Sequence, residues 1–416
     1  MKSVMNQCLF PAKIGAGRFA LEHLPFDLGS YGASRPMVIC SEEADSESTL
    51  APLADAFRGS GISLGVFSLS GDATPETVKE AWGHFSEGGF DSVIAVGGGA
   101  IMDVAKALCV AGGAGPDALR NLMQGGRRVV GQAPLAWVPT LDLDGFETTP
   151  SFRLKGQTLE AMEVAPRIIT IDPRMMSGKV KNTLSEAALR AFVSALCLYE
   201  ADISATLSRP YAHMVAGRVL AGLFPLLAAN EETPGLFSRL KARWFTPCRE
   251  EEMAFVTALA LSGSLYPALK KSLTGNLAHS LSEGARVSEP VLAAVLLPSV
   301  LEYAHKVRGE DLSDLLLSLG DRDTQCATPR SQRSEKGLSM IREALNRLWF
   351  VSETASPRTL SEAGVEIESL ADIGAQVAES VTGWQPHEVE ALLVGAYTDI
   401  PFETRTTPVK SAEEVA

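Results

Sequence analysis

The stretch from Asp91 to Leu108 constrains the fold more than any other part of the 416-residue sequence. Val93 to Val96 is a short apolar run rich in β-branched residues, as a buried strand of a parallel sheet requires. Gly97-Gly98-Gly99 follows, and a helical pattern begins after it. A turn without Cβ atoms lets backbone N–H groups approach an anion, and the start of the next helix carries partial positive charge. The stretch therefore predicts a strand, a phosphate-binding turn and a helix, although three glycines alone also fit a tight turn without a ligand.

Strand-like and helix-like segments alternate through the first half of the sequence. Residues 36–40, 62–67, 135–140 and 168–172 are short apolar runs typical of buried strands. Thr74-Pro75-Glu76 is a favourable helix start, with a capping hydroxyl and a proline in the first turn. This alternation predicts an α/β fold whose parallel sheet is covered on both faces.

The character of the sequence changes after about residue 173. Long apolar-periodic segments dominate from about residue 184, and clusters of β-branched residues become rare. We therefore predict an α/β dinucleotide-binding domain over residues 1–178 and an all-helical C-terminal domain over residues 179–416. Within the second domain, the polar stretch 320–336 predicts a mobile loop.

Composition excludes several classes of partner. The net charge is −13 and the pI is about 5.1, which argues against nucleic acid or an anionic lipid surface. The six cysteines are far apart and form no C-x-x-C pair, as expected for reduced thiols in a cytoplasmic protein. The sequence shows no signal peptide and no apolar run long enough to span a membrane.

The glycine stretch also resembles a known signature. Gly97-Gly98-Gly99-Ala100-x-x-Asp103-x-Ala105-Lys106 is similar to the GGGS-x-x-D-x-A-K signature of the iron-dependent (group III) alcohol dehydrogenases, with Ala100 in place of serine. The resemblance extends from Phe10 to about Tyr397. It implies the dehydroquinate synthase-like fold of this family, in which an α/β domain binds NAD or NADP and a helical domain holds a divalent metal. It also implies interconversion of small alcohols and aldehydes.

A second segment of the family pattern, I-P-T-T-x-G-T-G-S-E-x-T, corresponds to residues 138–149. Pro139, Thr140, Gly145, Glu147 and Thr149 match the pattern. Asp142 and Asp144 do not match, and in this loop they would repel a pyrophosphate unless they are simply solvated.

The family holds the ribose hydroxyls at the end of its second strand. That place falls on Ser41, with Glu42 next, so both NAD and NADP remain open as cofactors. The resemblance thus implies these cofactor-binding residues: Ser41, Gly97, Gly98, Gly99, Asp103, Lys106, Thr140 and Thr149.

The four positions of the family's metal ligands do not keep their ligands. Counting from Asp172-Pro173 places the first pair on Arg190 and Ser194, and the register anchored at His279 places the second pair on Gly275 and Glu289. Arginine stays protonated and glycine has no side chain, whereas Zn²⁺ or Fe²⁺ needs several good donors. We therefore expect no Fe or Zn. A rebuilt site using Glu289, His279 and a displaced carboxylate is the alternative.

Two functions remain open. An NAD(P)-dependent oxidoreductase without a metal would use Arg190 to hold the developing alkoxide or an anionic group of the substrate, and His279 to donate a proton. His279 could equally be a packed helix histidine. Arg190 and Glu289 are expected to form an ion pair across the position that the metal occupies in the family, unless each side chain is solvated.

The second function is that of a non-catalytic dinucleotide-binding or interaction protein derived from the family. The partner of an active enzyme would be a small alcohol or aldehyde, and the sequence leaves a homodimer open.

Overall fold

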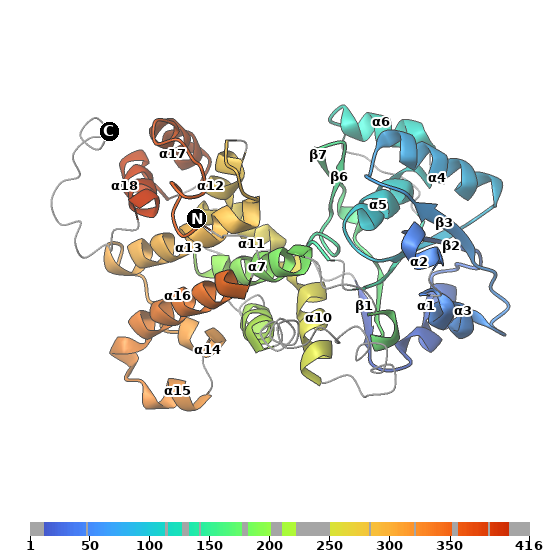
Figure 1. Cartoon of the computed structure of the whole chain (residues 1–416), viewed down its shortest axis with the longest axis horizontal. Coiled ribbons are helices and arrows are strands. Elements are labelled where there is room, and N and C mark those ends of the chain that lie inside the picture. Colours follow the sequence, from blue (N-terminus) through green and yellow to red (C-terminus); the bar gives the residue numbers. More distant parts are fainter. Residues whose placement is uncertain are drawn as a thin grey trace, which may run out of the picture. The chain divides into compact units, whose positions relative to one another are not determined.

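The computed structural model describes residues 12–46, 49–112, 115–126, 133–140, 143–176, 182–200, 210–221, 250–282, 284–319, 322–351, 357–381 and 383–398. These residues divide into two compact units (Figure 1). The first unit comprises the described residues up to 184 together with 250–263. The second comprises the described residues of 185–221 and 264–398.

A parallel sheet of six strands forms the centre of the first unit, in the order β1-β8-β5-β4-β2-β3. Every neighbouring pair in this sheet is parallel, which confirms the predicted architecture. All residues of β4 and β5 are buried, as their continuous apolar runs predict. The strands are β1 (Lys13–Ala16), β2 (Pro36–Ser41), β3 (Gly65–Leu69), β4 (Ser92–Val96), β5 (Leu135–Val138) and β8 (Ile168–Ile171).

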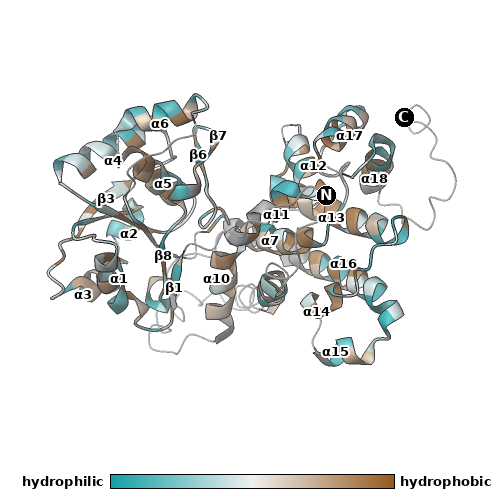
Figure 2. Ribbon diagram, turned by 180° about the vertical axis from the view of Figure 1, so that it is seen from behind, coloured by the Kyte–Doolittle hydropathy of each residue, from teal (hydrophilic) through white to brown (hydrophobic). Residues whose placement is uncertain are grey.

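Helices cover both faces of this sheet. Leu24 and Leu28 of α1 and Leu53 of α3 pack in one core with Val38 and Ile94 of the sheet. Helices α4 and α5 pack against each other, and Figure 2 shows α5 as apolar along most of its length. The helices beside this sheet are η1 (Ala20–His23), α1 (Leu24–Ser30), α2 (Glu42–Ser46), α3 (Ala51–Phe57), α4 (Pro75–Glu87), α5 (Ala100–Gly112) and α6 (Pro116–Met123).

The helix start predicted at Thr74 is confirmed, because the Thr74 hydroxyl accepts a hydrogen bond from the Thr77 N–H at 3.1 Å.

A short antiparallel hairpin of β6 (Ser151–Leu154) and β7 (Gln157–Glu160) lies beside α5 (Figure 1). Its turn consists of Lys155 and Gly156, whose φ angles are 50° and 79°. This hairpin was not predicted from the sequence. Two short 3₁₀ segments, η2 (Met162–Val164) and η3 (Pro173–Met175), flank β8.

The described part of the second unit contains helices and no strand, as predicted. Helix α10 (Glu250–Ser262), by contrast, contacts β8 and belongs to the first unit. A helix over residues 210–221 adds to the second unit. The other elements of that unit, of which α7 and η6 begin within the first unit, are α7 (Asn182–Leu196), η4 (Cys197–Tyr199), η6 (Gly263–Leu265), α11 (Tyr266–Lys271), α12 (Leu273–Ser282), α13 (Glu289–Lys306), α14 (Leu315–Leu319), α15 (Arg322–Ala327), η7 (Arg330–Gln332), α16 (Arg333–Val351), α17 (Ser369–Ser380) and α18 (Pro386–Thr398).

The loop predicted over residues 320–336 is wrong for most of its described length. Helix α15 and the start of α16 occupy it, because polar residues suit an exposed helix as well as a loop. Asp323 lies in the first turn of α15, where the helix dipole favours a carboxylate. In the described part of the chain, every helix is too short or too polar to cross a membrane.

Candidate functional site

The glycine turn lies at the carboxyl end of β4 and leads directly into α5. Gly97 and Gly99 have φ angles of 125° and 53°, which other residues rarely adopt. The Trp137 indole donates a hydrogen bond to the Gly97 carbonyl at 2.6 Å, and the Asp103 N–H donates to the Gly99 carbonyl at 3.0 Å. A Cβ added at Gly99 would meet no described atom within 4 Å. Hydrogen bonds to the carbonyl groups of Gly97 and Gly99 therefore hold the turn in place, and the space where a Gly99 side chain would lie is open.

This turn lies at a topological switch point of the sheet. The chain passes from β2 to the edge strand β3 on one side, and from β4 to β5 on the other side, while β2 and β4 are neighbours. Open α/β sheets bind ligands in the crevice that such a switch point creates at the carboxyl ends of the strands. Because Ile39 pairs with Ala95, Ser41 and Gly97 lie at the same level of the two strands. The structure thus brings the predicted residues Ser41 and Gly97 together.

The two remaining hydroxyl residues of the predicted cofactor set are buried. Thr140 lies two residues after β5 and is 9% exposed, and Thr149 is 1% exposed. The Thr149 hydroxyl donates to the Phe146 carbonyl at 2.8 Å and accepts from the Ser151 N–H at 3.2 Å. The Ser41 hydroxyl accepts from the Ala44 N–H at 3.2 Å, at the start of α2.

Lys106 is fully buried, and its ammonium contacts backbone carbonyls. It donates to the Phe146 carbonyl at 2.7 Å and to the Ser151 carbonyl at 2.8 Å. Burial lowers the pKa of Lys106 to about 8, an effect that nearby Asp103 and Glu147 oppose. These contacts hold segment 146–151 against α5, so they give Lys106 a structural role beside the turn.

Asp103 and Asp144 are joined by one arginine. Asp103 accepts hydrogen bonds from the Arg153 N–H at 3.0 Å and from its Nε at 3.3 Å. The Nη2 of Arg153 also bonds to the Asp144 carboxylate, and the guanidinium lies 4.9 Å from the centre of the Phe146 ring. Burial raises the pKa of Asp103 above its usual value, although the positive charge of Arg153 acts in the opposite direction. Asp144 is therefore paired within the protein, whereas Asp142 lies outside the described residues.

Glu147 stabilises the loop that carries Asp144. Its carboxylate is 3% exposed and accepts the N–H groups of Asp144 at 2.7 Å and Gly145 at 2.9 Å. Burial raises the pKa of Glu147 to about 8. The family residue Glu147 thus shapes the loop through backbone contacts.

Arg190, Ser194, Gly275 and Glu289, the positions that correspond to the family's metal ligands, belong to the second unit, and the Gly275 position is closed by the backbone. A Cβ added at Gly275 would lie 2.0 Å from the Leu269 carbonyl oxygen and 2.8 Å from its carbon. Both atoms are backbone atoms at α11, so a side chain fits only if that backbone moves. Gly275 therefore excludes a metal ligand by sterics as well as by chemistry.

His279 and Glu289, which belong to the same set of predicted site residues as Gly275, contact each other. The Nδ1 of His279 is 3.3 Å from Oε2 of Glu289, with side chains that are 77% and 29% exposed. Arg190 and Ser194 lie on α7, and Ser194 is 3% exposed. The recorded contact of Glu289 is thus with His279, and its predicted pairing with Arg190 stays a prediction. Within the described residues, no group of three or more His, Cys, Asp or Glu side chains could hold a metal ion.

Sequence reasoning missed a polar cluster next to Gly275. The Glu200 carboxylate accepts from the Thr274 N–H at 3.0 Å and from its hydroxyl at 2.5 Å, at the start of α12. Burial raises the pKa of Glu200 to about 7. The Gly275 N–H donates to the Ser272 hydroxyl at 2.9 Å. No motif links Glu200 to Thr274, which are 74 residues apart, so only the structure could identify this helix cap.

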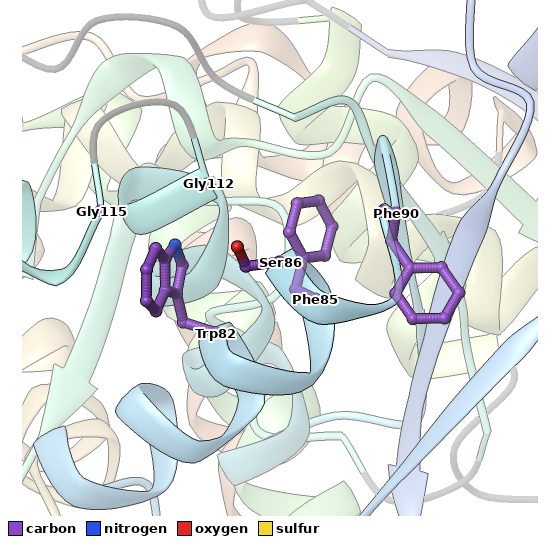
Figure 3. Close-up of a pocket in the computed structure, with 7 residues that line it drawn as sticks. Trp82, Phe85, Ser86, Phe90, Gly112 and Gly115 are labelled. Carbon is purple, nitrogen blue, oxygen red and sulfur yellow. The ribbon is translucent and has the colours of Figure 1, made fainter.

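A hollow of about 370 Å³ lies at the other end of α5 from the glycine turn (Figure 3). Aromatic side chains and glycines line it, and none of them titrates near neutral pH. The hollow therefore offers packing but no catalytic chemistry. Its lining residues are Trp82, Phe85, Ser86, Gly89, Phe90, Gly112 and Gly115.

The sequence of this chain is similar to those of several known proteins. Residues 11–173 match the family model described as iron-containing alcohol dehydrogenase. The maleylacetate reductase of Rhizobium sp. (strain MTP-10005) is 26% identical over 404 residues, which cover 94% of this chain and 96% of that protein. The lactaldehyde reductase of Escherichia coli (strain K12) is 22% identical, covering 89% of this chain and 93% of that protein.

Solved structures share the fold of most of this chain. A 1,3-propanediol oxidoreductase has a TM-score of 0.70 at 19% identity and covers 94% of this chain and 100% of its own. The maleylacetate reductase of Agrobacterium tumefaciens has a TM-score of 0.65 at 20% identity, with coverage of 95% and 99%. At such identities these structures show the fold alone.

Proposed function

We propose that this chain, a relative of the iron-containing alcohol dehydrogenases, binds a nicotinamide dinucleotide and uses it to oxidise or reduce a small alcohol or aldehyde. One observation carries the proposal: the turn from Gly97 to Gly99 lies at the switch point between β2 and β4, and the space next to Gly99 is open. Its backbone and the start of α5 offer N–H groups and partial positive charge to a pyrophosphate. Ser41, at the same level of β2, would lie near the adenosine ribose.

The bound dinucleotide would supply or accept the hydride. The protein would then have to hold the substrate oxygen and move a proton. His279 is our candidate proton donor, and its neighbour Glu289 would orient the imidazole through Nδ1. Arg190 is our candidate for the positive charge beside the substrate oxygen or a substrate carboxylate. The names of the relatives, maleylacetate reductase and lactaldehyde reductase, are consistent with reduction of a small carbonyl compound.

The residues present do not fit the family's metal. Gly275 has no room for a ligand, Arg190 cannot coordinate, and the nearby His279 and Glu289 contact each other. We therefore propose a protein without Fe or Zn. The same observations favour a second candidate function, a dinucleotide-binding protein without turnover, which would keep the glycine turn and lose the chemistry.

Dinucleotide binding should depend on the open space above Gly99. Asparagine tolerates the left-handed backbone better than other residues, so Gly99→Asn should fold and fill that space. We expect its Kd for NADH or NADPH to rise roughly 100-fold by calorimetry, since the phosphate loses its place. Gly156→Asn is the matched control, because Gly156 also has a positive φ and open surroundings but lies in the hairpin turn. Absence of NADH and NADPH binding by the wild type at millimolar ligand would refute the proposed function.

The purified protein should contain no stoichiometric iron or zinc. The reason is the closed Gly275 position and the lack, among the described residues, of a group of three His, Cys, Asp or Glu side chains that could hold a metal. Elemental analysis before and after a chelator wash would measure the metal content. Near-equimolar metal that survives the wash would contradict this prediction. Oxidoreductase turnover by the metal-free protein would separate the enzyme from the non-catalytic alternative.

A further inference from the structure

The carboxylates beside the glycine turn create an electrostatic difficulty for a bound pyrophosphate. Asp103 lies in the first turn of α5, and its own N–H bonds to Gly99. Asp144 lies in the loop that follows β5. An unpaired carboxylate at either position would repel a phosphate a few ångströms away. Lys106 does not offset this charge at the surface, because its ammonium is buried and bonds to two carbonyls.

Arg153 is the partly exposed cation between these two carboxylates. Its side chain is 39% exposed, whereas those of Asp103 and Asp144 are 7% and 19% exposed. The two carboxylates and the Phe146 ring hold the guanidinium, and the Arg153 N–H fixes its backbone to Asp103. A planar guanidinium held in this way has a defined orientation and keeps N–H donors beyond those that the carboxylates use.

We propose that Arg153 is an anion-binding residue of the dinucleotide site, which neutralises Asp103 and Asp144 and offers its remaining N–H donors to the cofactor pyrophosphate. The inference rests on the proposed function and deepens it. The guanidinium is one hydrogen bond away from Asp103, and Asp103 is one helical turn beyond Gly99. Guanidinium groups bind phosphate oxygens through two parallel hydrogen bonds, which an ammonium cannot do. The competing interpretation is a purely structural clamp that holds the β6–β7 hairpin on α5.

Calorimetric titration of the full-length protein with NADH and with ADP would test the proposal. ADP keeps the pyrophosphate and lacks the nicotinamide. We expect Arg153→Gln to raise both Kd values roughly 10- to 100-fold, as for loss of a charged hydrogen bond. Arg153→Lys, which keeps the charge but loses the planar fork, should raise them by a smaller factor, and it provides a folded variant if Arg153→Gln is unstable. Lys155→Asn is the matched control on the same hairpin: the cation is exposed, asparagine accepts its φ of 50°, and Kd should stay within about twofold of wild type.

Asp144→Asn separates the two interpretations. It removes one carboxylate, keeps an oxygen for the Phe146 N–H that Asp144 now accepts at 3.0 Å, and leaves Arg153 in place. If Arg153 binds the pyrophosphate, this variant should lower the Kd for ADP roughly threefold to tenfold, since the local charge becomes more positive. A structural clamp would instead give a lower unfolding temperature and an unchanged Kd.

Three results would overturn the inference while the wild type still binds NADH. They are unchanged ADP affinity in the Arg153 variants, a loss of affinity confined to NADH, and unchanged ADP affinity in Asp144→Asn. A wild type that binds neither NADH nor NADPH would instead overturn the proposed function itself.

Discussion

Lys106→Met should lower the free energy of unfolding by roughly 2–6 kcal/mol, at about 1–3 kcal/mol for each of two buried carbonyl groups left without a donor. The side chain is fully buried, and its ammonium satisfies the carbonyls of Phe146 and Ser151. Methionine fills a similar volume but donates no hydrogen bond, so both carbonyls lose their donor in a buried place. The carboxylate of Glu147 also loses the favourable charge of Lys106, and burial already disfavours its charged form.

Urea unfolding of the ligand-free protein would measure this loss. Lys79→Met is the matched control, because Lys79 is an exposed lysine on α4, and its unfolding midpoint should stay near that of wild type. The ligand-free protein matters, since a lysine that only bound cofactor would leave the stability unchanged in its absence. A midpoint for Lys106→Met equal to that of Lys79→Met would refute the structural role.

The sequence was most informative where neighbouring residues decide the structure. The run from Val93 to Val96 forms a buried central strand, the glycines adopt positive φ at Gly97 and Gly99, and α5 begins at Ala100. Each of these depends on apolar periodicity or on backbone freedom, which a local pattern reveals. The Thr74 cap is of the same kind.

Contacts between distant segments were not predictable in this way. Arg153 is 50 residues from Asp103, and Glu200 is 74 residues from Thr274. Nothing in the local pattern marks one arginine in a hairpin as the partner of an aspartate on a helix. From the sequence, Asp144 was therefore expected to repel phosphate or to face solvent, whereas the structure pairs it with Arg153. The prediction of a loop over residues 320–336 was also wrong, because its polar residues suit an exposed helix as well as a loop.

The positions that correspond to the family's metal ligands show both what the sequence can predict and what it cannot. Counting along the family pattern predicts that the ligands are replaced, and the residue types follow from the sequence. The sequence cannot show whether the space beside Gly275, where a ligand side chain would lie, is empty or filled. That depends on a backbone carbonyl in the preceding helix. At Gly275 the space is filled by the Leu269 carbonyl. A glycine that looks like a simple loss of histidine is thus required by the packing of α11 against α12.

Gly275→Ala should therefore destabilise the protein by roughly 3 kcal/mol, the upper part of the range for overpacking. Helix propensity alone predicts the opposite sign, since alanine in a helix is more favourable than glycine by about 0.5–1 kcal/mol. Gly83→Ala supplies that comparison, because Gly83 lies in α4 and a Cβ there would meet no described atom within 4 Å.

Urea unfolding of both variants would separate the two effects by sign. For the same reason, restoring Arg190→Asp, Ser194→His and Gly275→His together should give a less stable protein rather than a metal-binding one, as measured by unfolding and elemental analysis. If Gly275→Ala were as stable as Gly83→Ala, α11 could move away from α12, and the predicted absence of a metal would rest on donor chemistry alone.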